Sequence, residues 1–304
     1  MLSTAAVLAL CLGLFMADHL ARAWRVQVLA RGLGNHTPFI KAFALNAASD
    51  ATSALTPLKL GGEPVRFGGL INAGLNVSDT IALISVEAII EWAVVITLGV
   101  SIFWHWGGAW WRTQQQVLLP RLGHAIPWVA LIIVVGIAIL FAFRKFLPQV
   151  SMYVGGTLRD SIRLARRMPA WAVAVTIPVT ALHVIARIAI LPAVFAILSN
   201  PPTLGTVVVG SFTLLYAQNF LPTPSGAGAI ELGFLDGAAG YVGPDAGALL
   251  VMWRFYTTLL PIGLGLVFGT AMYVPVLHRI ARFILLRRRR ARRRIFQRDN
   301  DAPG

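Results

Sequence analysis

Long runs of apolar residues dominate the chain and predict helices that cross a membrane. Five runs reach the roughly 17–25 residues that a helix needs to span a hydrocarbon core: 1–17, 80–104, 125–143, 171–198 and 246–274. Two more apolar regions are broken by glycine, proline and polar side chains: 39–75 and 204–241. This pattern predicts an all-α polytopic membrane protein with about five full spans and two broken hairpins.

The composition excludes a water-soluble enzyme. Of 304 residues, 57% are hydrophobic and only 12% are charged, whereas soluble domains carry about 25% charged residues. A soluble chain of this length needs more polar side chains to cover its surface. The single cysteine, Cys11, rules out an intrachain disulfide or a thiolate metal site.

The distribution of basic residues predicts the orientation of the spans. Lys and Arg number three in 18–38, six in 144–169 and ten from residue 279 onward, against two in 105–124. Basic loops stay in the cytoplasm, so we expect the N-terminus outside and the C-terminus inside a bacterial-type cytoplasmic (inner) membrane. No positive charge precedes 1–17, so we expect a retained helix rather than a signal peptide.

This map makes the two broken regions enter the membrane from opposite faces. Region 39–75 starts and ends inside, whereas region 204–241 starts and ends outside. Opposed broken hairpins are typical of inverted repeats, so we predict one transmembrane domain, 1–278, with halves of roughly 1–145 and 146–278. A cytoplasmic Arg-rich tail, 279–304, would follow. The alternative is that each region forms two full, kinked helices.

The two broken regions share an order of residues that predicts unwound helices around a polar site. Asparagine, proline, glycine and glutamate follow one another in both. Proline removes a backbone donor and glycine frees the backbone, and unwound backbone in lipid must be buried or reached by water. We expect both breaks to lie close together near the midplane. The candidate substrate-binding residues there are Asn46, Pro57, Glu63, Arg66, Asn219, Pro224, Gly226, Gly228 and Glu231.

Charged residues inside the predicted spans have two interpretations. Glu87 and Glu91 lie one turn apart, as do His183 and Arg187, and Arg254 lies in the last span. In the structural interpretation the two glutamates pair with Arg187 and Arg254. In the functional one Arg66, Arg187 and Arg254 bind an anionic headgroup, because the guanidinium fork suits phosphate, while Glu87 and Glu91 relay protons or couple an ion. His183 is expected to be a packed polar residue.

The sequence resembles a known membrane family on four elements: Leu55-Thr56-Pro57 with Gly61 to Arg66, Asn219 to Glu231, Arg22-Ala-Trp24-Arg25, and Glu87 with Glu91. These elements are similar to those of the lysylphosphatidylglycerol synthase transmembrane region, a flippase-like family. The chain departs from the family pattern at Ala88, where an arginine is frequent, and at Glu91, where aspartate is usual. Because no aminoacyl-transfer domain follows in this sequence, the resemblance implies the lipid-translocating part of such synthases.

Two functions remain open on these grounds. The first is a transporter that moves an anionic lipid or polyprenyl-phosphate-type amphiphile between leaflets, without cofactor, metal or catalytic residues of its own; no ATP-binding loop is present. The second is a membrane-embedded accessory protein or enzyme of lipid or glycolipid synthesis, with other enzymes of that synthesis as partners. Membrane lipids are the expected partners, and the arginine tail is expected to bind anionic lipid headgroups rather than nucleic acid.

Pairs of glycines four residues apart occur in the last span and in the second broken region. They are Gly265 with Gly269, and Gly233 with Gly237. Small residues at this spacing let helices approach closely. We therefore expect close helix packing at both pairs.

Overall fold

The protein is helical throughout the part that the structure describes. The computed structural model describes the backbone of residues 3–143 and 159–271, and no strand occurs in these residues. The α-helices are α1 (Thr4–Gly32), α2 (Phe39–Leu55), α3 (Gly62–Asn72), α4 (Val77–Phe143), α6 (Ala170–Phe195), α7 (Leu204–Ala217), α8 (Ala229–Val242) and α9 (Ala246–Arg254). Short turns join them: 3₁₀ turns η1 (Pro57–Lys59), η2 (Pro224–Gly226) and η3 (Gly243–Asp245), and the π-helical turn η4 (Phe255–Leu259). Helices also cover 159–166 and 260–271.

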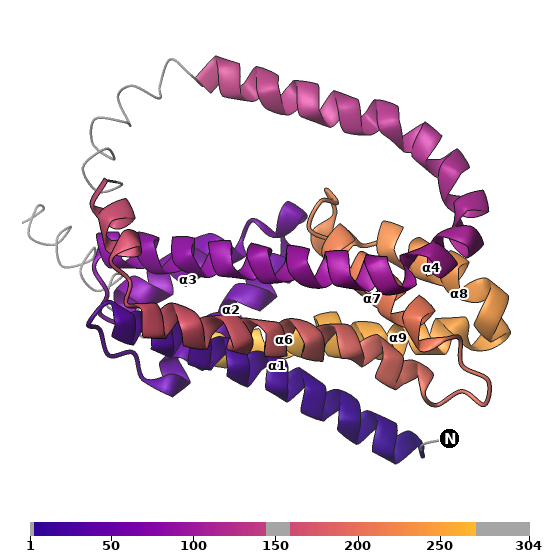
Figure 1. Cartoon of the computed structure of the whole chain (residues 1–304). Helices are drawn as coiled ribbons and strands as arrows, with labels where there is room; N and C mark the ends of the chain where they lie inside the picture. The colour runs from indigo at the N-terminus through magenta and orange to yellow at the C-terminus, as the bar shows by residue number, and fades with distance from the viewer. Residues whose placement is uncertain (1–2, 144–158, 272–304) are drawn as a thin grey trace, which may run out of the picture.

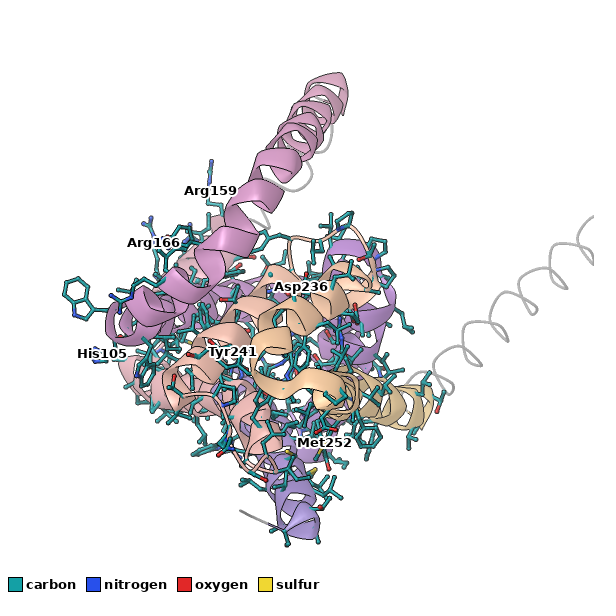
Figure 2. All side chains as sticks on the ribbon, turned by 90° about the vertical axis from the view of Figure 1, so that its right-hand side faces the viewer. His105, Arg159, Arg166, Asp236, Tyr241 and Met252 are labelled. Carbon is teal, nitrogen blue, oxygen red and sulfur yellow. The ribbon has the colours of Figure 1, made fainter. Side chains whose placement is uncertain are left out.

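Four helices are long and apolar enough to cross a membrane, which confirms a polytopic membrane protein. They are α1, residues Val77–Gly108 of α4, α6, and the continuous helix Gly243–Ala271. The fifth predicted span, 125–143, continues α4 without a break, but its side chains lie outside the described residues. Figures 1 and 2 show this arm of α4 standing away from the other helices. The predicted tail, 279–304, also lies outside the described residues.

Two predicted loops are wrong, because both are helical. The loop expected at 18–38 is part of α1 as far as Gly32, and Arg22 and Arg25 lie inside the bundle rather than in a loop. Their charges are matched by acidic partners on other helices, so the helix tolerates them. The loop expected at 105–124 is also helical and belongs to α4. The basic residues of these two segments therefore do not interrupt the helices.

The core of the bundle is formed mainly by α1 and α6, which pack along each other (Figure 1). The last helix lies against α2 at Gly265, where an added Cβ would collide with the Ala47 carbonyl oxygen and the Ala51 side chain. At Gly269 a Cβ would come within 3.2 Å of Ala48. The predicted close packing at this glycine pair is confirmed.

The two broken regions form hairpins that come from opposite ends of the bundle (Figure 1). The first consists of α2, η1 and α3, and the second of α7, η2 and α8. Their turns η1 and η2 are in contact. The two tips approach from opposite ends of the bundle and touch each other. Each hairpin therefore extends through only part of the bundle. This contact between the tips favours the re-entrant interpretation over the alternative of full, kinked helices.

Candidate functional site

The tips of the two hairpins have the same backbone conformation. In each, a threonine in extended conformation precedes a proline: Thr56 before Pro57, and Thr223 before Pro224. The residue after proline is left-handed in both, with φ of 52° at Leu58 and 49° at Ser225. Such a φ is uncommon for residues other than glycine, and its occurrence at matching positions indicates that the two breaks are equivalent.

The tips are joined directly across the bundle. The Ser225 hydroxyl donates a hydrogen bond to the Ala54 carbonyl over 3.0 Å. These residues are 171 positions apart in sequence. The predicted closeness of the two breaks is thus confirmed, while their depth in a bilayer stays a prediction.

An ion pair holds the second tip against the last span. Arg254 lies 2.5 Å from Glu231 and donates to the Ser225 carbonyl at 3.2 Å. Glu231 in turn accepts from the backbone N–H of Gly228, at 2.7 Å. Gly226 and Gly228 both have positive φ, at 69° and 87°, which glycine adopts without a Cβ penalty. This cluster positions the tip, and the guanidinium of Arg254 is already occupied by protein groups.

A second set of ion pairs ties the first hairpin to α1 and α4. Glu87 is 2% exposed and pairs with both Arg66 of α3 and Arg25 of α1. Arg25 also reaches Glu91 at 2.8 Å and lies 3.0 Å from His183 Nε2. The two glutamates therefore pair with arginines that the structural interpretation did not name.

A third cluster joins α1 to α2 and contains residues that the sequence assigned to a loop. Arg22 binds Asp50 at 2.8 and 2.5 Å and Asp18 at 3.0 Å. His19 lies 3.3 Å from Asp50, and His183 lies 3.3 Å from Asp18. A buried charge needs such partners, because an isolated one costs several kcal/mol. His183 is therefore a packed polar residue, as expected, and belongs to this network.

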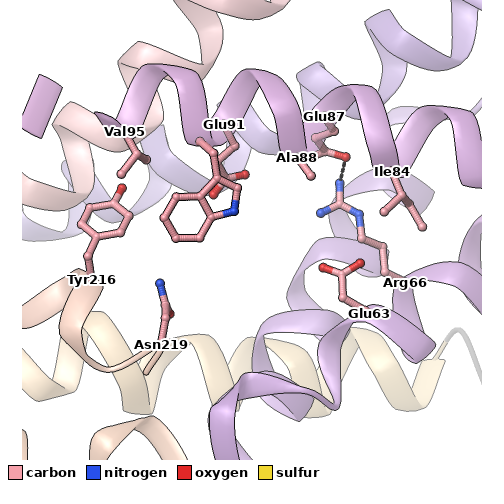
Figure 3. A pocket seen from close by; sticks show the side chains of 10 residues that line it. Glu63, Arg66, Ile84, Glu87, Ala88, Glu91, Val95, Tyr216 and Asn219 are labelled. Carbon is pink, nitrogen blue, oxygen red and sulfur yellow. Dashed lines mark hydrogen bonds and ion pairs between the residues drawn. The ribbon is translucent and has the colours of Figure 1, made fainter. Parts of the chain in front are cut away.

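A polar cavity of ≈ 240 Å³ lies between the tips and the three charged clusters. A smaller space of ≈ 200 Å³ adjoins it on the α4 side. The two spaces share five lining residues: Glu63, Arg66, Glu91, Tyr216 and Asn219. Figure 3 shows most of them facing the smaller space, with Arg66 held to Glu87.

Two cations in the wall of the larger cavity make no direct ion pair within the described residues. They are Arg187 of α6 and Lys59 of η1, and both are half-buried. Every other cation that lines the cavity has one: Arg22, Arg25 and Arg66. Hydrogen-bonding groups of Tyr216, Gln218 and Asn219 line the same space. The two cations and several neutral hydrogen-bond donors of the wall can thus bind an oxyanion in the cavity.

The structure brings together most of the predicted site residues. Glu63, Arg66, Glu91, Asn219 and Arg187 line the cavity, whereas the prolines and glycines shape the two tips. Asn46 is not among the residues that line either space, and its side-chain nitrogen is buried without a hydrogen-bond partner. Sequence reasoning missed Lys59 and Tyr216, although Lys59 stands inside the first motif. It also missed Asp18 and Asp50. The signal that could have revealed them is an acidic residue within or next to an apolar segment.

These features define a class of protein: an α-helical, multi-pass membrane protein in which two re-entrant hairpins enclose a charged cavity. The chain belongs to the family of the lysylphosphatidylglycerol synthase transmembrane region, whose family model matches residues 2–265. The matched range contains both hairpins and every residue of the cavity wall. None of the curated proteins matches the chain. Membership of this family indicates a lipid-related function in the membrane.

Proposed function

We propose that the protein moves an anionic amphiphile between the two leaflets of a membrane. The amphiphile would be a phospholipid or a polyprenyl-phosphate-type lipid. The observation that carries this proposal is the pair of unmatched cations, Arg187 and Lys59, in a cavity walled by both hairpin tips. A phosphate group could pair with both of them.

The chemistry of the wall favours phosphate over a neutral headgroup. Guanidinium groups bind phosphate through two parallel hydrogen bonds, and lysine adds a point charge. Uncompensated charge is expensive in a membrane protein, so two unmatched cations are expected to attract an anion. Tyr216 and Asn219 can donate hydrogen bonds to the remaining oxygens.

The arrangement of the hairpins supplies a route between leaflets. One tip comes from each end of the bundle, and opening on either side of the tip contact would expose the cavity to that side. Glu91 is the candidate for ion or proton coupling, because its side chain is 38% exposed and lines both spaces. Glu87 is fully engaged by two arginines and fits a structural role. The protein would act without ATP hydrolysis of its own and without being an enzyme.

The proposed setting is the cytoplasmic membrane of a bacterial-type cell, with the N-terminus outside. The alternative function is an accessory protein or enzyme of lipid or glycolipid synthesis, in which the same cavity holds a lipid without moving it. Membrane lipids are partners in both cases. Enzymes of lipid synthesis are partners only in the second.

Reconstitution into liposomes tests the proposal. Fluorescent phosphatidylglycerol in the inner leaflet becomes accessible to a membrane-impermeant quencher only when it is moved outward. We expect Arg187→Gln to slow this movement about 10–100-fold, since a charged hydrogen bond contributes about 1.5–3 kcal/mol. Arg163→Gln is the matched control, because Arg163 is 60% exposed and outside the cavity. Wild-type protein that binds the lipid without moving it would support the accessory function instead.

A further inference from the structure

A second, apolar groove of ≈ 460 Å³ lies between the two arms of the second hairpin and α6. It is larger than the polar cavity and carries no charged residue among those that line it. Two of its three polar side chains are engaged: Thr213 donates to the Val209 carbonyl at 2.8 Å, and Thr206 lies 2.9 Å from the Thr203 hydroxyl. The third, Tyr241, is 39% exposed. The groove therefore favours an apolar group.

Glycines create this groove. An added Cβ at Gly210 of α7 or Gly237 of α8 would meet no atom within 4 Å. At Gly233 the nearest atom is a methyl of Leu214, at 3.6 Å. The close packing predicted for Gly233 and Gly237 is therefore wrong, and these positions leave space instead. Figure 2 looks onto the end of the bundle where α8 lies, with Asp236 and Tyr241 of this helix labelled.

The groove and the polar cavity lie on opposite sides of one short stretch of chain. Leu214, Ala217 and Leu221 line the groove. Leu215, Gln218 and Asn219 line the polar cavity. Helix α7 ends at Ala217, so the wall beyond that residue is the unwound backbone of the second tip. A ligand that occupied both spaces would have to pass this end of α7.

We propose that the groove holds a hydrocarbon chain of the same amphiphile whose anionic group lies at Arg187 and Lys59. This inference rests on the proposed function for the headgroup, and it adds that the protein recognises the tail. A volume of ≈ 460 Å³ falls in the ~300–1,000 Å³ range of small-molecule sites. The cavity provides charge and the groove provides apolar surface, which together match an amphiphile and neither a free phosphate nor a neutral hydrocarbon.

The test fills the groove without changing the charged cavity. Gly237→Leu and Gly210→Leu place a side chain in the open space, and leucine favours a helix more than glycine does. Gly263→Leu is the matched control, because an added Cβ there also meets nothing within 4 Å and the residue does not line the groove. Binding of dioleoyl and dihexanoyl phosphatidylglycerol is measured on purified full-length protein by native mass spectrometry.

We expect the wild type and Gly263→Leu to prefer the long-chain lipid. Both groove variants should lose this preference by about fivefold or more, because methylenes that occupied the groove are displaced. Their affinity for the short-chain lipid should not change. A long-chain lipid with a photoreactive group at its chain end should label residues 204–242 in the wild type, and this labelling should disappear in Gly237→Leu.

Unchanged preference and unchanged labelling in both groove variants would refute the groove as the tail site. Arg187→Gln separates this outcome from failure of the proposed function. If Arg187→Gln weakens binding of both lipids while the groove variants behave as wild type, only the groove assignment fails. If the groove variants lose the chain-length preference while Arg187→Gln has no effect, the groove assignment stands and the headgroup assignment fails.

Discussion

Replacing Glu87 by glutamine tests whether the buried charge network holds the first hairpin in place. Glu87 pairs with two arginines, Arg25 and Arg66, and is 2% exposed. Removing one partner of a buried pair costs about 3–5 kcal/mol, because the remaining charge is left without compensation. Arg25 keeps Glu91 at 2.8 Å, so the loss falls mainly on Arg66. We therefore expect a value near the lower limit, about 3 kcal/mol.

The assay is thermal unfolding of the purified protein in detergent, followed by tryptophan fluorescence. A loss of 1 kcal/mol lowers the Tm of a domain of this order of size by about 2–4 °C, so we expect Glu87→Gln to lower the Tm by about 6–12 °C. Glu63→Gln is the control: Glu63 lines the same cavity but has no ion pair in the described residues. Its Tm should stay within about 1 °C of the wild type, as for most surface substitutions.

The double variant Glu87→Gln/Arg66→Met measures the coupling between the two side chains. Removing both charges eliminates the uncompensated arginine, so part of the lost stability should return. We expect a coupling energy of at least about 1.5 kcal/mol. Equal Tm values for Glu87→Gln and Glu63→Gln, or strictly additive effects in the double variant, would refute the assigned role of Glu87.

Three further outcomes follow from the geometry. Cysteines at Leu58 and Ser225, in a Cys11→Ala background, should crosslink within one chain, because η1 and η2 are in contact. The crosslink should stop lipid movement and leave the Tm unchanged or higher, and its failure to form would contradict the tip contact. A cysteine at Asn200 should react with an impermeant thiol reagent in intact cells, whereas one at Arg163 should react only after permeabilisation, and the reverse result would invert the proposed orientation. Gly228→Ala should lower the Tm by about 2–8 °C, because φ is 87° there and a side chain at such a φ costs about 1–2 kcal/mol. Gly247→Ala is the control on α9: an added Cβ there meets no atom within 4 Å, so the Tm should not fall.

Hydropathy was enough to predict four of the five expected spans, and the Pro and Gly pattern was enough to predict the breaks. Both signals are local: an apolar run needs only its own residues, and the sequence Thr-Pro sets a turn from within. The opposed direction of the hairpins also followed from parity of the spans. For these parts of the fold no distant contact had to be known.

The charged residues of α1 could not be placed in this way. Asp18, Arg22 and Arg25 read as the end of a span because each one taken alone is too polar for a membrane interior. They are accommodated only because Asp50, Glu91 and His183 lie beside them. These partners stand 28, 66 and 165 residues away along the chain, so no local pattern reveals them. The same reason explains why Lys59 was missed, and why Arg187 could be told apart from the paired Arg66 and Arg254 only once the ion pairs of the other arginines were known.

The strengths of the contacts also indicate where the molecule is expected to move. Each hairpin is tied to a full helix by an ion pair: Arg66 with the buried Glu87 for the first hairpin, and Arg254 with Glu231, which is 33% exposed, for the second. Breaking a buried pair such as that of Glu87 costs about 3–5 kcal/mol. Within the described residues the tips are in contact and share the neutral hydrogen bond from Ser225 to Ala54, worth about 0.5–1.5 kcal/mol.

Because the weaker contact yields first, each hairpin should move together with the helix that anchors it, and the boundary should open between the tips. In the proposed function, a phosphate bound to Arg187 and Lys59 would bridge α6 and the first tip, beside that boundary. Ligand binding would therefore act on the contact that is easiest to break. A crosslink between the tips should then block movement more completely than loss of either ion pair, which ranks the tip crosslink above the Glu87 variant in its effect on transport.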